Sequence, residues 1–161
     1  MSWCSKRRLL AAAAAAVVVA AAAEPAAAQG VREVDVHVLG VVSRPLFGGA
    51  GVGYAWRDAR RTRLLGALAL GPVGGGGVAG RADLAWNFLL DPAERAGSAV
   101  YGGGGLTVQA GAGRVTPYLL LVIGVENHPG GRGGWYVELG VGGGVRAAIG
   151  YRWRKRGAPG R

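Results

Sequence analysis

The chain has 161 residues, a length that normally forms a single domain around one core. Its only cysteine is Cys4. A single cysteine excludes an internal disulfide framework, and the rest of the chain has no thiol that could bind a metal. The formal net charge of +10 comes almost entirely from arginine. We expect no nucleic-acid partner, because the sequence contains neither a recognition helix nor an aromatic stacking motif.

Residues 1–28 have the three parts of a secretory signal peptide. Residues 6–8 are basic, residues 9–23 form an apolar run, and small residues precede a cleavage site before Gln29. The apolar run is shorter than the roughly 20 residues that a membrane-spanning helix needs. We therefore predict that this segment is a cleaved signal peptide and that the mature chain is exported.

The chain after the signal peptide repeats one unit, an alternating segment closed by a turn signal. No part of it shows the three- and four-residue spacing of an amphipathic helix, and its many glycines disfavour helices. Alternation with period two is typical of a strand with two unlike faces. The sequence predicts six strands at residues 31–42, 48–57, 62–70, 80–90, 98–110 and 115–126, and two more as the arms of a final hairpin within 134–154.

The fourth and sixth predicted strands illustrate the pattern and its weak point. The strand at 80–90 carries Leu84, Trp86 and Phe88 on one face, against charged or small residues on the other. Pro117 removes one backbone donor from the sixth strand, which is tolerable near a strand start. Because all the connections are short, the sequence predicts an all-β fold, a closed eight-stranded antiparallel up-and-down barrel. Eight is also the smallest number of strands that closes around an interior filled by side chains.

The composition of the two faces indicates which one is outside. One face is rich in Val, Leu, Trp and Tyr, and the other is mostly Gly and Ala with a few charges. A soluble barrel needs Lys, Glu, Thr and Ser on its wet face, whereas a narrow barrel needs small residues inside. We therefore predict a transmembrane barrel with its apolar face towards lipid. The alternative is a soluble, secreted, lipocalin-like barrel whose apolar face points inward and binds an apolar ligand.

The inward face carries charges of both signs. Charges taken out of water must be paired to be tolerated, so we predict an interior salt-bridge network that plugs the barrel. Glu138 is expected to pair with Arg146 or Arg152 on the adjacent strand. The predicted members of the network are Glu33, Asp35, Arg63, Arg81, Asp83, Glu138, Arg146 and Arg152, and Arg57 and Glu126 also lie on the inward face.

The predicted threading gathers the aromatic residues at one end of the barrel. If the barrel starts and ends on the periplasmic side, with odd strands running outward, four tryptophans fall on the inner rim. They are Trp56, Trp86, Trp135 and Trp153, and they predict a membrane-interface aromatic rim. Several basic residues share this rim, namely Arg60, Arg61, Arg95, Arg132, Arg154, Lys155 and Arg156. We therefore expect a monomer whose partners are outer-membrane lipids.

Taken together, these features resemble the small eight-stranded outer-membrane β-barrel proteins of diderm bacteria. The resemblance covers residues 29–153, the predicted barrel, and is most specific in the closing stretch VELGVGGGVRAAIGYRW. It implies an outer-membrane location and a role in envelope integrity, adhesion or lipid modification, among which the fold does not choose. The chain departs from that pattern in its basic tail at 154–161 and in its short outer loops, of which 72–79 is the longest. These short loops argue against a receptor or adhesin.

Two further motifs do not indicate catalysis. Residues 75–80 match GxGxxG, but a strand rather than a helix is predicted after them, so we expect no nucleotide site. Asp35, His37 and Ser43 could suggest acyl transfer, but Ser43 belongs to a turn and we interpret His37 as a polar side chain that fills the interior. His128 falls at the opposite rim, which excludes a two-histidine metal site. We predict a non-enzymatic structural or interaction component of the cell envelope, without a cofactor.

Overall fold

The structure, a computed structural model, describes residues 30–58, 61–93, 95–111 and 113–156, and the predicted signal peptide lies outside these ranges. Within these ranges there are eight strands: β1 (Val31–Val42), β2 (Phe47–Arg57), β3 (Thr62–Pro72), β4 (Val78–Leu89), β5 (Ser98–Gly111), β6 (Arg114–Asn127), β7 (Gly133–Val141) and β8 (Val145–Arg156). Within the described ranges, no helix is long and apolar enough to span a membrane.

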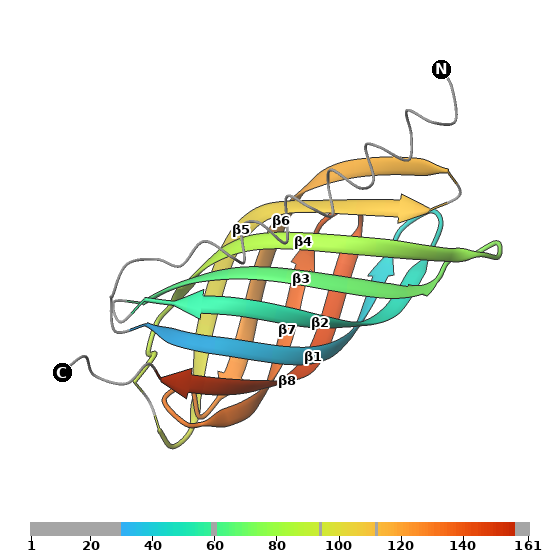
Figure 1. Cartoon of the computed structure of the whole chain (residues 1–161). Helices are drawn as coiled ribbons and strands as arrows, with labels where there is room; N and C mark the ends of the chain where they lie inside the picture. Colours follow the sequence, from blue (N-terminus) through green and yellow to red (C-terminus); the bar gives the residue numbers. More distant parts are fainter. Residues whose placement is uncertain (1–29, 59–60, 94, 112, 157–161) are drawn as a thin grey trace.

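The strands pair in chain order, and β1 closes the barrel by pairing with β8 (Figure 1). Every pair is antiparallel. This confirms the closed eight-stranded antiparallel up-and-down barrel that the alternation predicts. We call the end of the barrel that holds the start of β1 and the end of β8 the terminal end, and the opposite end the hairpin end.

Side-chain burial alternates along the strands in the predicted sense. On β4, Trp86 and Phe88 are more than half exposed, whereas Arg81 and Asn87 are buried inside the barrel. Every strand presents apolar side chains outward, and the alternate, inward positions hold mostly glycine, alanine and charged residues, with a few larger apolar side chains such as Phe47 and Leu120. The lipocalin-like alternative is therefore wrong, since it requires the Val, Leu and Trp face to line the interior.

The connections differ from expectation in one respect. The connection expected at 72–79 spans only residues 73–77, although it is still the longest at the hairpin end, and the longest connection of the barrel lies at the terminal end, at residues 90–97 between β4 and β5. The cause is that β3 and β4 extend further than the alternation indicates, with Gly71 paired to Ala79 and Pro72 paired to Val78. Glycine and proline are uncommon in strands and interrupt the apolar–polar alternation, so the sequence pattern does not indicate a strand at these positions.

The last strand is also longer than expected. β8 continues to Arg156 and stays paired with β1 to its end, with Arg154 opposite Glu33 and Lys155 opposite Arg32. The barrel therefore does not end at residue 153, and residues 154–156 belong to a strand rather than to a tail. Pairing with β1 on one side, and the bond from the Arg154 N–H to the Arg132 carbonyl at 2.7 Å on the other, hold this segment extended.

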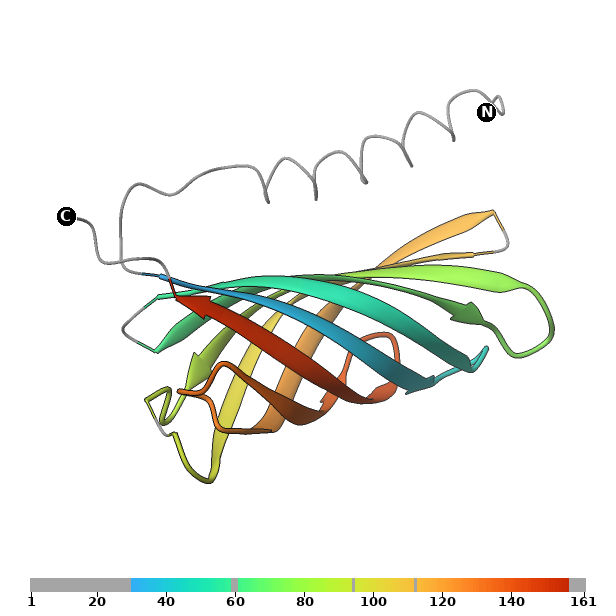
Figure 2. The same ribbon diagram turned by 60° about the horizontal axis from the view of Figure 1, so that its bottom comes forward.

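The hairpin end of the barrel is uneven. β6 pairs with β5 from Arg114 to Asn127, but with β7 only from Leu121 to Glu126. The β5–β6 hairpin therefore projects beyond β7, as the orange hairpin at the upper right of Figure 2 shows. The inner side of this end holds a cluster of buried apolar residues, Leu39, Val41, Phe47, Ala69, Ala79 and Ala148.

Candidate functional site

The interior of the terminal half is organised around two glutamates. Glu33 on β1 and Glu126 on β6 are both buried, and four buried arginines converge on them. We call these six residues the Glu126 cluster: Glu33, Glu126, Arg57, Arg63, Arg152 and Arg154. They come from five strands, so the cluster connects opposite walls of the barrel.

Glu126 carries most of the contacts in this cluster. Arg63 Nη2 donates to both of its oxygens, at 2.8 and 2.7 Å, while Arg152 Nη1 and Arg154 Nη2 donate to Oε2 at 2.8 and 3.0 Å. Arg63 Nε lies 2.7 Å from Glu33 Oε2, so one guanidinium joins the two glutamates. The four hydrogen bonds to Glu126 are charge-assisted, which is the strong class of hydrogen bond, whereas the contact between Arg63 Nε and Glu33 is an ion pair only.

The four arginines outnumber the two glutamates, and backbone carbonyls accept some of the remaining N–H groups. Arg57 Nη1 donates to the carbonyl of Pro129 at 3.0 Å, and Arg154 Nη1 donates to the carbonyl of His128 at 3.1 Å. Pro129 and Gly130 are buried. The β6–β7 connection is thereby held over the terminal mouth of the barrel.

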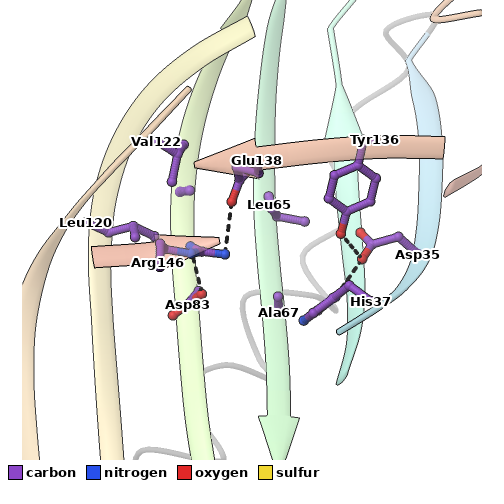
Figure 3. A pocket seen from close by; sticks show the side chains of 11 residues that line it. Asp35, His37, Leu65, Ala67, Asp83, Leu120, Val122, Tyr136, Glu138 and Arg146 are labelled. Carbon is purple, nitrogen blue, oxygen red and sulfur yellow. Dashed lines mark hydrogen bonds and ion pairs between the residues drawn. The ribbon is translucent and has the colours of Figure 1, made fainter. Parts of the chain in front are cut away.

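A second group of charges lies towards the hairpin end, and we call it the Asp83 cluster: Arg81, Asp83, Glu138 and Arg146. Arg146 lies between two carboxylates, with Nη2 at 2.9 Å from Glu138 Oε1 and Nη1 at 3.1 Å from Asp83 Oδ2 (Figure 3). Arg81 Nε donates to Asp83 Oδ1 at 3.0 Å, and Thr107 also donates to this oxygen. Sequence reasoning named Arg146 and Arg152 as possible partners of Glu138, and the structure places Arg146 there.

Between the two clusters lies a smaller group on β1 and β7. His37 Nδ1 and the hydroxyl of Tyr136 both lie 2.9 Å from Asp35 Oδ1 (Figure 3). Ser43 does not join them, because its hydroxyl donates to the carbonyl of Pro45 in the β1–β2 turn. The structure therefore does not assemble an acyl-transfer triad from these residues.

A small space separates this group from the Asp83 cluster. Its lining includes Asp35, His37, Asp83, Glu138 and Arg146, together with apolar side chains. No group of three or more potential metal ligands occurs within the described ranges.

The two tyrosines of the interior connect the clusters, and their role is not evident from alternation alone. Tyr136 stacks beneath Arg152, whose guanidinium carbon lies 4.3 Å from the ring centre. Tyr101 lies under Arg63 at 5.2 Å and donates its hydroxyl to Glu138 at 3.1 Å. A cation over an aromatic face is attracted by the ring quadrupole. In the sequence, a tyrosine at an inward-facing position of a barrel that also has inward-facing arginines indicates such a cation–aromatic contact.

The structure thus places all eight residues of the predicted network inside the barrel, together with Arg57 and Glu126, which the sequence also assigns to the inward face, and it adds Arg154. Arg154 was missed because the sequence analysis assigned it to the tail. The signal was present, since Arg152 and Arg154 share the same phase of the alternation. His128, in contrast, is exposed at the terminal end, far from His37 in the interior.

The four tryptophans of the predicted rim all belong to the terminal end. Trp86, Trp135 and Trp153 are between 43 and 55% exposed, and Trp56 is half-buried on the same outward face. Tyr54, Phe88 and Tyr151 also point outward at this end. In the described part of the chain, the hairpin end has no outward-facing aromatic residue.

Comparison with known proteins relates this architecture to other barrels. Neither a protein-family model nor a curated protein sequence matches the chain. The N-terminal β-barrel domain of Pseudomonas aeruginosa OprF matches with a TM-score of 0.57 and 16% identity, over 79% of this chain and 100% of that domain. Neisserial surface protein A matches with a TM-score of 0.54 and 10% identity, over 77% of this chain and 96% of that one. The chain has the fold of a small outer-membrane β-barrel.

Proposed function

We propose that the chain is a non-enzymatic component of the bacterial outer membrane, in which it acts as a structural or interaction element of the cell envelope. The observation that carries this proposal is the distribution of side chains. Apolar residues cover the outside of all eight strands, whereas the charged residues in the middle of the strands are buried within, and the exposed ones, Arg32, Arg114 and Lys155, lie at strand ends. A surface of this kind is unstable in water and matches a bilayer, whose core contains no hydrogen-bonding partners.

The proposal includes export by the N-terminal signal sequence at residues 1–28, outer-membrane lipids as partners, and a monomeric state. It also includes an interior closed to solutes. The support is that the Glu126 cluster and the β6–β7 connection occupy the terminal half, whereas an apolar cluster that includes Val41 and Phe47 occupies the hairpin end. Eight-stranded barrels are narrow enough for side chains to fill them.

Heat-modifiable migration tests the membrane barrel. We expect the purified protein, in detergent, to run faster on a gel when it is unheated than after boiling, and to remain in the membrane fraction after extraction with carbonate. A detergent-independent soluble monomer would contradict the proposal. Addition of the protein to a planar bilayer tests the closed interior, and stable conductance steps would show an open channel.

The absence of enzymatic activity is tested separately, through the one buried histidine of the described residues. Lipid-modifying activity in vesicles that contain the purified barrel, together with its loss in a His37→Ala variant, would overturn that part of the proposal. We expect neither result, because His37 is buried inside the barrel, with its side chain 5% exposed, and Asp35 engages its Nδ1.

A further inference from the structure

The outward face of the β1–β8 seam ends in two cations placed side by side at the terminal end. Arg32 on β1 and Lys155 on β8 are cross-strand partners, and both side chains are exposed. Directly opposed residues in an antiparallel pair have Cβ atoms about 5 Å apart, and like charges at such positions destabilise the pair. No salt bridge joins either side chain to a carboxylate of the described residues.

Two tryptophans border this pair of cations. Trp56 on β2 is the cross-strand partner of Arg32, on the side opposite Lys155. Its indole Nε1 lies towards Gly30, because a Cβ placed on that glycine would overlap it. Trp153 is the second tryptophan, two residues before Lys155 and opposite Val34. Trp56, Arg32 and Lys155 therefore occupy neighbouring positions in one outward-facing row across three strands, and all three side chains carry donors.

We propose that Arg32, Lys155 and Trp56 form a binding site for the phosphate of an anionic phospholipid, in the leaflet at the terminal end. This inference rests on the proposed membrane location of the barrel. A phosphodiester supplies the negative charge and the acceptor oxygens that the three donors lack. Arginine and lysine near a membrane surface attract anionic headgroups, and tryptophan prefers the same depth.

The position of the site favours a lipid over a free phosphate ion. The three donors lie on the outward face, in line with Val34 and Val36 of β1 and with Ile149 of β8, which are 43 to 53% exposed. A lipid whose phosphate is bound at Arg32 can lay its acyl chains along these side chains. A free phosphate ion gains nothing from that apolar surface.

Native mass spectrometry of the full-length barrel tests the site. The protein is released from detergent micelles that contain equal amounts of phosphatidylglycerol and phosphatidylcholine, and the retained lipids are identified by mass. We expect wild type to retain phosphatidylglycerol preferentially. In R32Q/K155Q the ratio of retained phosphatidylglycerol to phosphatidylcholine should be about tenfold lower. R44Q/R114Q is the matched control, because it removes two exposed positive charges from the hairpin end and should keep the preference. Heat-modifiable migration of each variant verifies its folding.

The other outcomes separate this inference from the proposed function. Undiminished preference in R32Q/K155Q, or equal loss in both double variants, would overturn the site. Displacement of phosphatidylglycerol by millimolar inorganic phosphate would overturn the commitment to a lipid. Retention of neither lipid, with the protein remaining in the aqueous phase when mixed with vesicles of phosphatidylglycerol and phosphatidylcholine, would instead contradict the membrane barrel itself.

Discussion

The buried carboxylates of this barrel differ in how many arginines they contact. Glu126 accepts hydrogen bonds from Arg63, Arg152 and Arg154, whereas Glu138 forms a salt bridge with Arg146 alone. Removing one partner of a buried ion pair leaves an uncompensated charge, and this cost exceeds the net gain of forming the pair. The cost of neutralising a carboxylate should therefore increase with the number of arginines that depend on it.

The first prediction concerns Glu126→Gln. This change keeps the shape of the side chain but leaves Glu33 as the one carboxylate of the Glu126 cluster for four buried arginines. We expect it to lower the free energy of unfolding by about 3 kcal/mol or more. Urea unfolding of the barrel in phospholipid vesicles, followed by tryptophan fluorescence, measures this quantity.

Glu138→Gln is the matched control, since it removes the same charge in the same way from a residue with one arginine partner. Its expected loss is smaller, because Arg146 keeps its contact with Asp83 at 3.1 Å. Equal losses in the two variants would show that the number of arginine partners does not determine the cost.

At the scale of strands, glycine permits close approach between neighbouring backbones. A Cβ on Gly105 in β5 would overlap the carbonyl oxygen of Leu84 in β4 and lie 2.8 Å from the Cα of Ala85. These are backbone atoms of the paired strand, so they cannot turn away as a side chain can. Gly66 in β3 has no atom within 4 Å of the same construction.

The second prediction compares Gly105→Ala with Gly66→Ala. We expect the first to destabilise the barrel by about 2 kcal/mol, because the strands must shift to admit the methyl group. The second should change the free energy of unfolding by less than about 0.5 kcal/mol. The same urea titration measures both variants, and comparable losses would show that the approach of β4 to β5 does not require a glycine.

The part of β6 that lies beyond β7 has one open edge. Gly111 and Arg114 flank a two-residue turn, so they form a hydrogen-bonded pair, and pairs alternate along the ladder. Pro117, opposite Val108, therefore falls at a non-hydrogen-bonded position relative to β5, and its nitrogen faces the open edge. A proline there removes a donor that another strand could use, which protects the edge from pairing with a second chain.

The third prediction is that Pro117→Thr promotes self-association. Threonine restores the missing N–H on the open edge and favours the extended backbone. We expect sedimentation in detergent to show a dimer fraction that grows with protein concentration and that wild type lacks. Thr116→Val, which adds no N–H donor to the open edge, serves as the control. If that variant also dimerised, the association would come from the apolar surface and not from the edge.

At the scale of the whole molecule, the fold was largely predictable because one rule, alternation with period two, determines strand positions and side-chain orientation together. Alternation determines which residues point inward, but not which of them meet. Arg63 and Glu126 lie on β3 and β6, on different walls of the barrel, and they meet because the pairing register brings them to the same height. Register depends on the tilt and stagger of all eight strands, which no local pattern encodes.

The same limit explains what the sequence analysis missed at the two ends of the barrel. Arg154 looks like part of a basic tail until its pairing with β1 turns it inward, towards Glu33 and Glu126. The projection of the β5–β6 hairpin depends on where β7 ends, and the glycines at 142–144 indicate a turn there without indicating that β6 continues past it. Strand ends, unlike strand faces, are determined by neighbouring strands.

The final prediction concerns the direction of the barrel in the membrane, which its loop lengths do not indicate. The distribution of charge does indicate this direction, because charged side chains are costly to move through the hydrocarbon core. Within the described ranges, the exposed charged residues of the hairpin end are Arg44 and Arg114, whereas the terminal end exposes Arg32, Arg61, Asp91, Arg95, Arg132 and Lys155. The hairpin end therefore crosses the bilayer at lower cost, and we expect it to face outward while both chain ends stay in the periplasm.

Cysteine labelling in intact diderm cells measures this orientation. The chain contains only Cys4, so Arg44→Cys and Arg132→Cys each place a new thiol at one end of the barrel, and wild type reports the background. A membrane-impermeant maleimide should label Arg44→Cys in intact cells, and should label Arg132→Cys only after the outer membrane is permeabilised. The reverse labelling pattern would show that the barrel has the opposite orientation in the membrane. It would also move the phosphate site of Arg32 and Lys155 to the outer leaflet, since both residues lie at the terminal end with Arg132.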